Sequence, residues 1–163
     1  MIAVLVWLAV AVPVAAKPGE DAAVAGWIET ARLLPSGLEL EAKLDSGAEH
    51  SSLHVEKRRY FRRDGVRWIR FTVEGQSGRK VAFERRLLRK AAIKQLSGRS
   101  SVRPVVAIKI CLGAVVKRVE VNLVDRSGYD YALLVGRSFL ADSFLVDTAA
   151  EALQSLACSE ESS

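Results

Sequence analysis

The chain has 163 residues, half of them hydrophobic, and a formal net charge of +5. A chain of this length is large enough to bury one genuine core. Its modest glycine and proline content and its high apolar content exclude a fibrous or intrinsically disordered body, so one compact domain is expected.

The N-terminus begins with an uncharged apolar run over residues 2–16, directly before Lys17. The run is too short to cross a bilayer comfortably, which takes roughly 20 residues. It resembles the apolar core of an export signal that ends in small residues, although no lysine or arginine precedes it. We therefore expect residues 1–16 to be a cleaved signal peptide, followed by a linker over residues 17–25. An uncleaved membrane tether and a mis-set start codon are the alternatives.

Alternation of apolar and polar residues, the period of a half-buried strand, recurs along the body of the chain. It is clear over residues 38–44, which lead into Asp45, and again over residues 68–74. Further strand-like segments cover residues 80–83, 105–112, 119–125 and 131–135. Short strands at this spacing predict an all-β barrel or sandwich.

Two segments are candidates for helix. Residues 137–142 have room for one short turn before the apolar segment 144–147. Residues 84–96 have a helix-favouring composition of leucine, arginine, lysine and alanine, although their second half is equally compatible with a strand.

Cys111 and Cys158 are the only cysteines. Cys111 lies in an apolar strand-like run, whereas Cys158 lies in a polar C-terminal tail, residues 151–163. We interpret Cys111 as a small buried hydrophobic residue and expect no disulfide.

The strand over residues 38–44 ends in the D-[ST]-G-[AS] pattern that surrounds the catalytic carboxylate of aspartic peptidases, here Asp45, Ser46, Gly47 and Ala48. That chemistry needs one ionised and one protonated carboxyl group around one water, since two carboxyls held close together cannot both ionise. The ionised group accepts a proton from the attacking water, and the protonated group stabilises the oxyanion. The chain has one such motif, so two chains must meet to build one active site.

A second motif lies far downstream and consists of Leu134, Val135, Gly136 and Arg137. In aspartic peptidase folds an apolar-apolar-glycine strand packs beneath the catalytic loop, and Gly136 permits close approach of the two backbones. Gly47 allows a tight loop, and Ser46 supplies a hydroxyl for a hydrogen bond to the partner loop.

The order of these motifs resembles that of a retropepsin, a single-domain aspartic peptidase that works as a homodimer. The body resembles more closely a bacterial retropepsin-like family long labelled "ATP-dependent zinc protease". The matching segments are 26–27, 42–48, 51–54, 97–106, 123–127, 133–137 and 144–147. The resemblance implies an all-β, retropepsin-like closed barrel over residues 26–150, with one short helix after the Gly-Arg pair, working as a homodimer. It also implies that Asp45 is catalytic and that the exported chain resides in the bacterial periplasm.

Glu49 and His50 depart from this family, in which a basic residue and a small hydroxyl residue are expected. Viral retropepsins often carry an acid at the position of Glu49, where it pairs with the arginine of the Gly-Arg motif. An ion pair between Glu49 and Arg137 is therefore one interpretation, and two solvated charges are the other.

A dimeric retropepsin also needs a flap, a hairpin that closes over the peptide and excludes water. One candidate turn is residues 75–78. The other lies around Ser97, Gly98, Arg99 and Ser100. We prefer the second, because it leaves residues 55–90 as an insertion relative to viral enzymes.

The label of the family raises zinc and ATP as cofactors. His50 and His54 are four residues apart, which would place both on one face of a helix. The H-E-x-x-H motif and a third histidine are missing, and no phosphate-binding G-x-x-x-x-G-K-[ST] pattern occurs. We expect neither a metal nor another cofactor.

Residues 57–63 hold five positive charges and two aromatic residues. In an exported protein this run indicates a solvated face, or contact with an anionic membrane or an acidic partner, rather than nucleic acid.

The sequence predicts an aspartic endopeptidase that hydrolyses peptide bonds with two Asp45 carboxylates, one from each subunit of a homodimer. A catalytically silent retropepsin-like module that binds peptides or regulates is the first alternative. A basic binding protein in which Asp-Ser-Gly is incidental is the second.

Overall fold

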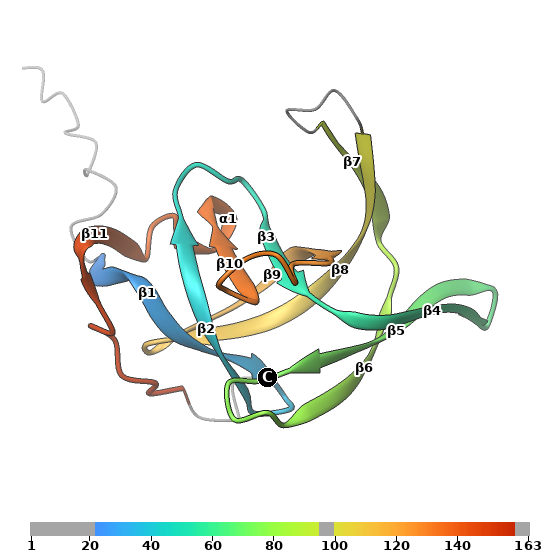
Figure 1. Cartoon of the computed structure of the whole chain (residues 1–163), viewed down its shortest axis with the longest axis horizontal. Coiled ribbons are helices and arrows are strands. Elements are labelled where there is room, and N and C mark those ends of the chain that lie inside the picture. The colour runs from blue at the N-terminus through green and yellow to red at the C-terminus, as the bar shows by residue number, and fades with distance from the viewer. Residues whose placement is uncertain (1–21, 95–99, 159–163) are drawn as a thin grey trace, which may run out of the picture.

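The computed structural model describes residues 22–94 and 100–158, in which strands predominate (Figure 1). The elements in chain order are β1 (Ala23–Leu34), β2 (Leu38–Asp45), β3 (Ser51–His54), β4 (Glu56–Arg63), β5 (Val66–Glu74), β6 (Lys80–Arg86), β7 (Arg89–Lys94), β8 (Ser100–Leu112), β9 (Val115–Val124), β10 (Leu133–Gly136), α1 (Arg137–Leu140) and β11 (Phe144–Glu151). The all-β prediction is confirmed.

The larger sheet has the strand order β11-β1-β2-β10-β3-β9-β8-β7 and closes on itself because β1 also pairs with β8. β1 is long enough to pair with three neighbouring strands. Its first half runs parallel to β11, and its second half lies between β2 and β8. Six strands thus form a closed barrel, with β11 and β7 as extensions, which confirms the retropepsin-like closed barrel.

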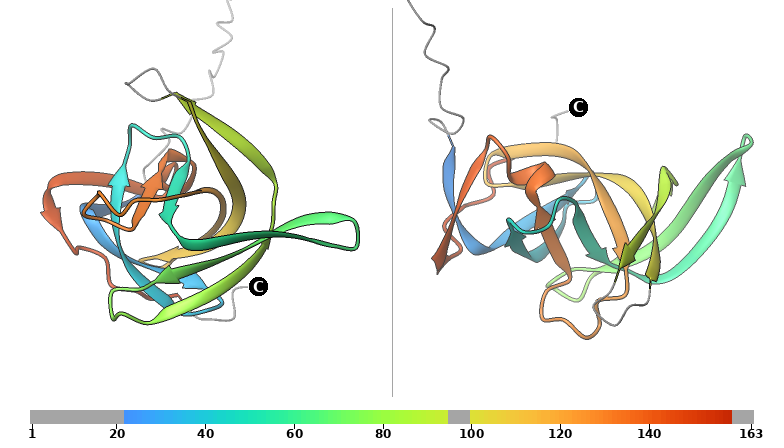
Figure 2. Two further views of the ribbon diagram at one scale, coloured as in Figure 1. Left: turned by 45° about the vertical axis from the view of Figure 1, so that its right-hand side comes forward. Right: turned by 90° about the horizontal axis from the view of Figure 1, so that it is seen from above.

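A second sheet has the order β4-β5-β6 and projects from the side of the barrel in both figures (Figures 1 and 2). Its inner face contributes Ile69, Phe71, Val73 and Phe83 to the same core that the barrel strands fill. Its outer face carries mostly charged side chains, and the basic run 57–63 lies on β4, largely exposed.

The alternation that the sequence shows corresponds to burial. Along β2 the side chains of Leu38, Leu40, Ala42 and Leu44 point into the core, and the charged residues between them are exposed or half-buried. Burial of one face fixes the register of this strand, since a slip of one residue would expose every apolar side chain.

The two helix candidates have opposite outcomes. The short helix after the Gly-Arg pair is present as α1, where Phe139 is buried and stacks on Phe144. A helix over residues 84–96 is wrong, because the described part of this segment, residues 84–94, holds the end of β6 and the strand β7. β7 pairs with β8 over its whole length, so cross-strand pairing overrides the helix-favouring composition.

The expectation of no disulfide is wrong, because Cys111 and Cys158 are bonded, with their Cα atoms 6.2 Å apart. Cys111 lies between Ile110 and Leu112 on β8, so its side chain points away from the barrel interior. The segment after β11 covers it there, with Cys158 and Leu156 packed alongside.

Residues 151–158 are consequently part of the folded domain rather than a free tail. The buried Glu29 carboxylate accepts hydrogen bonds from the backbone N–H groups of Gly26, Leu153 and Gln154. At the other end, β1 begins at Ala23, within the segment that we interpreted as a linker.

In the part of the chain that the structure describes, no helix is long and apolar enough to span a membrane. The expected signal peptide, residues 1–16, lies outside the described residues.

Candidate active site

Asp45 is the last residue of β2 and lies beside Gly136 of the parallel strand β10. Its carboxylate Oδ1 accepts hydrogen bonds from the backbone N–H groups of Gly47 at 2.9 Å and Ala48 at 3.2 Å. Within the described ranges the second oxygen accepts no hydrogen bond, and Ser46 and Gly47 are exposed. The carboxylate is therefore held at one oxygen and open at the other.

Gly136 lies directly beneath the Asp45 loop. A Cβ atom at this position would lie 2.7 Å from the carbonyl carbon of His50 and 3.0 Å from the carbonyl oxygen of Ala48. Its backbone N–H donates to the hydroxyl of the fully buried Ser51 at 3.2 Å. Only glycine permits the two backbones to approach this closely, so β10 supports the loop through its backbone.

Arg137 holds the same loop from the other side. Its Nη1 donates to the carbonyl oxygens of Ser46 at 2.9 Å and Gly47 at 2.8 Å. The Glu49 side chain is 73% exposed, and its Oε1 lies 3.7 Å from the Nε2 of His50. The proposed Glu49–Arg137 ion pair is thus not formed within the chain, because the arginine is already bonded to main-chain carbonyls.

The two histidines do not form the pair that a zinc site would need. His54 ends the strand β3 and His50 lies in the bend before that strand, so the two histidines do not share one face of a helix. His54 Nδ1 accepts a hydrogen bond from the backbone N–H of Arg126 at 2.8 Å, and His50 Nε2 lies 3.3 Å from Arg89 Nη2. No group of three potential metal ligands occurs in the described ranges.

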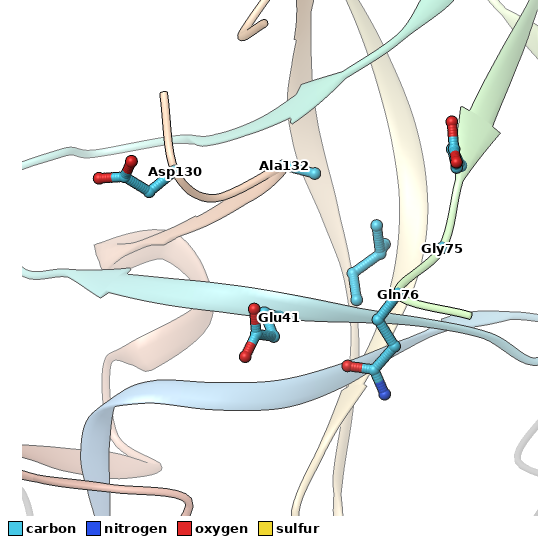
Figure 3. A pocket seen from close by; sticks show the side chains of 7 residues that line it. Glu41, Gly75, Gln76, Asp130 and Ala132 are labelled. Carbon is cyan, nitrogen blue, oxygen red and sulfur yellow. The ribbon is translucent and has the colours of Figure 1, made fainter. Parts of the chain in front are cut away.

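The turn at residues 75–78, the first candidate flap, lies near the start of β2. The backbone N–H of Gln76 donates to the carbonyl of Glu39 at 3.0 Å, near the start of β2, whereas Asp45 ends that strand. Figure 3 shows Gly75 and Gln76 near β2, and both residues line a pocket together with Glu41.

The preferred flap is the hairpin of β7 and β8, which rises on the same side of the barrel as the loop between β2 and β3 (Figures 1 and 2). Of the four candidate flap residues, Ser100 begins β8, and Ser97, Gly98 and Arg99 lie outside the described residues. The strands that would carry a flap are therefore in place.

Arg126 is a residue near β3 to which the sequence pattern assigned no role. It follows β9 and is half-buried, and its Nη1 donates to the Ser52 hydroxyl at 3.1 Å. Burial lowers the pKa of its guanidinium, and the charge of Arg103 acts in the same direction, whereas Tyr129 and Asp45 act to raise it. The contact with Ser52 places Arg126 beside β3, the strand that follows the Asp45 loop.

A profile of the family described as "RimB-like: Retropepsin-like aspartic endopeptidase RimB" matches residues 24–156. A crystal structure of a Legionella pneumophila protein, described as having unknown function, superposes with a TM-score of 0.70. It is 35% identical in sequence, and the match covers 80% of this chain and 97% of that one.

Two curated relatives are named "Probable alpha-L-glutamate ligase". The protein from Shewanella pealeana is 35% identical over 66% of this chain, and the one from Desulfotalea psychrophila is 33% identical over 68%. In both cases the match covers 24% of the relative. The chain therefore spans about a quarter of the length of these ligases.

Proposed function

The chain belongs to the RimB-like family of retropepsin-like aspartic endopeptidases, and we propose that it hydrolyses peptide bonds with Asp45 as its catalytic residue. The observation that carries the proposal is the Asp45 carboxylate at the end of β2. One oxygen accepts two backbone hydrogen bonds, and the other is open to a ligand.

A single carboxylate cannot both activate a water and protonate the leaving amine in one step, so the proposed active site contains Asp45 from two chains. Two features support a homodimer. Ser46 and Gly47 are exposed at the end of the barrel, and the Ser46 hydroxyl makes no hydrogen bond within the described residues. Both are therefore accessible to the corresponding loop of a second copy.

In the proposed reaction one Asp45 is ionised and the other is protonated. The ionised carboxylate accepts a proton as water attacks the peptide carbonyl, and the protonated one stabilises the oxyanion that forms. The backbone N–H groups of Gly47 and Ala48 orient the carboxylate for this role. The hairpin of β7 and β8 excludes water above the bound peptide.

The ligase name of the curated relatives describes proteins about four times as long as the segment that they share with this chain. We therefore propose no ligase activity for the shared segment. The proposed location is the bacterial periplasm, on the evidence of the apolar run at residues 2–16.

The test is cleavage of a denatured protein mixture by the full chain, from acid to neutral pH, with and without a chelator. Asp45→Asn is expected to lower the rate by about three orders of magnitude, the range of general acid–base effects. Asp64→Asn is the matched control, because Asp64 lies in the β4–β5 turn, where its positive φ also suits asparagine.

Sedimentation and thermal unfolding must show that both variants remain folded and in the same oligomeric state as the wild type. Wild-type cleavage that Asp45→Asn abolishes and the chelator leaves unchanged supports the proposal. Absence of cleavage by folded, dimeric protein at every pH would favour the silent peptide-binding module instead.

A further inference from the structure

A pocket of about 140 Å³ lies where residues of β1, β6, β8 and β9 meet. The residues that line it are Leu34, Pro35, Arg85, Ala107, Lys109 and Arg118. Three of these six residues are cations and none is an acid. The lining of this pocket is therefore strongly positive.

The strand register brings two of the cations together. Lys109 on β8 lies directly opposite Arg118 on the antiparallel strand β9. Lys109 shares a face of β8 with Cys111, whose side chain points away from the barrel interior, so this pair lies on the outside of the barrel. Like charges directly opposite each other destabilise a sheet, so the pairing carries a cost in the absence of an anion.

Arg85 brings the third charge from the second sheet, near the end of β6. Its Nη1 donates to the carbonyl of Glu84 at 2.9 Å, and its guanidinium lies 5.3 Å from the centre of the Phe83 ring. Burial lowers the pKa of the Arg85 guanidinium, and the charge of Arg118 acts in the same direction. A half-buried cation is costly when it loses water without gaining an opposite charge.

The acids closest in sequence to these two arginines are already bonded elsewhere. Glu84 accepts hydrogen bonds from Arg63 and Arg70 on the outer face of the side sheet. Glu120 accepts two hydrogen bonds from Arg89, at 3.0 and 2.6 Å. Within residues 22–94 and 100–158, no carboxylate pairs with either arginine of the pocket. A bound anion would supply the missing charge.

We propose that this pocket binds a phosphate group, held by Arg85, Lys109 and Arg118, as free phosphate or as the headgroup of an anionic lipid. The oxygens of a phosphate point in several directions from one centre, so donors from three strands can reach the same group. The planar guanidinium of arginine donates paired hydrogen bonds to phosphate, and lysine binds it as a point charge.

The pocket is separate from the proposed active site. Pro35 lies in the turn before β2, whereas Asp45 is the last residue of that strand. A strand of eight residues spans roughly 26 Å, so the two sites belong to opposite ends of β2. The inference therefore does not depend on the proposed endopeptidase function, and its test needs no cleavage.

The first test is calorimetric titration of the full chain with inorganic phosphate, against chloride at the same ionic strength. The wild type is expected to bind phosphate at one saturable site. Arg118→Gln is expected to weaken this binding by about tenfold or more, as for loss of a hydrogen bond to a charged group. Arg85→Lys keeps the charge but removes the paired donors, so it should also weaken binding.

Thermal unfolding gives a second readout that separates binding from a structural role. Without phosphate, Arg118→Gln should be at least as stable as the wild type, because the substitution removes a like charge opposite Lys109. Phosphate should raise the Tm of the wild type more than that of the variant, since it binds the folded state. Arg118 is exposed, so this variant keeps the test decisive even if Arg85→Lys proves unstable.

The matched control is Arg59→Gln, which changes the net charge by the same amount. Arg59 lies on β4, separated from β6 by β5, and pairs with Arg70 on the outer face of the side sheet. This variant should bind phosphate as the wild type does. Absence of saturable phosphate binding by the folded wild type, or binding that survives both pocket substitutions, would overturn the proposal.

Cosedimentation with phosphatidylglycerol vesicles, against phosphatidylcholine vesicles, distinguishes the two sources of phosphate. Vesicle binding that free phosphate competes away and Arg118→Gln removes would identify the ligand as a lipid headgroup. Phosphate binding without vesicle binding would identify it as free phosphate. Vesicle binding that needs Arg59 but not Arg118, with no binding of free phosphate, would assign the membrane contact to the basic run 57–63 and overturn the pocket.

Discussion

The Asp45 loop and the side sheet of β4, β5 and β6 are both exposed, but they keep their shapes by different means. Main-chain groups hold the loop: Arg137 bonds to two of its carbonyls, and Gly136 lets the supporting strand approach without a side chain between them. The side sheet instead attaches to the barrel through a buried apolar inner face, and ion pairs connect its outer face.

In the Asp45 loop, the contacts position individual atoms, whereas in the side sheet they attach a whole sheet to the barrel. Backbone hydrogen bonds and a missing Cβ define atomic positions in the loop, so small changes there should affect chemistry more than stability. Apolar burial in the side sheet supplies stability without directing any particular group, so changes there should affect stability more than chemistry. Substitutions in the Asp45 loop should therefore lower cleavage more than stability, and substitutions in the side sheet should lower stability more than cleavage.

The largest effect on stability is expected for Phe71→Ala on the inner face of the side sheet. Phe71 is fully buried and stacks on Phe83, with ring centres 5.6 Å apart. Loss of a buried phenylalanine side chain costs about 3–5 kcal/mol of unfolding free energy. Denaturant unfolding measures this loss, and the activity per folded molecule should stay close to that of the wild type.

A loss below about 1.5 kcal/mol, the usual cost of a volume-conserving swap, would contradict this account. It would mean that the side sheet is attached only loosely to the barrel. A large fall in the activity of the folded fraction would contradict the idea that the side sheet supplies stability without shaping the Asp45 loop.

Gly136→Ala beneath the Asp45 loop should cost less stability, about 1–3 kcal/mol as for an overpacked site. The added Cβ would lie 2.7 Å from the His50 carbonyl carbon, so the loop must move and cleavage should be nearly abolished in protein that remains folded. Thermal unfolding and cleavage are measured on the same samples. Gly128→Ala is the stability control, because a Cβ there would meet nothing within 4 Å.

Near-normal cleavage by Gly136→Ala would show that the loop tolerates displacement. The proposed role of the close backbone approach would then be wrong.

The smallest effect is expected for Glu84→Gln on the outer face of the side sheet. Hydrogen bonds from Arg70 and then Arg63 hold the pKa of the Glu84 carboxyl below its usual range. A carboxyl whose pKa is lowered by folding stabilises the folded state above its unfolded pKa, and this contribution disappears as the pH falls through the folded value. The difference in Tm between wild type and Glu84→Gln should therefore be small at neutral pH and vanish in acid.

Cleavage activity should not change in Glu84→Gln, because the ion pairs of Glu84 with Arg63 and Arg70 lie on the outer face of the side sheet, outside the Asp45 loop. A difference in Tm that grows in acid would show that some other group accounts for the effect of the substitution.

Much of the fold follows from local pattern. The alternation over residues 38–44 corresponds to β2, the apolar run before Gly136 to β10, and the short apolar turn after Arg137 to α1. The local pattern indicates no strand at β1, β3, β4 or β11. β3 is only four residues long, and β4 lies on a sheet with one solvated face and a dense run of basic residues, so neither has a clear apolar period.

In the candidate site, too, some residues can be found from local sequence pattern and others only from the structure. The Asp45 motif and the Gly136 motif are contiguous in sequence, so a search by pattern finds both of them. Arg126 has no such signal, because it is a single charged residue shortly after the end of β9. Its contacts depend on the tertiary structure, since Ser52 belongs to β3 and Tyr131 to the loop before β10.

The sequence by itself determined the strand-rich class, the position of the catalytic motif and the need for a glycine beneath it. These features depend on residues within a few positions of one another, and period and steric size are sufficient to reveal them. Only the tertiary structure decided the Cys111–Cys158 bond, the partners of Arg137 and the pairing of β1 with β8 that closes the barrel. Each of these joins segments far apart along the chain, and barrel closure, rather than local preference, determines which segments meet.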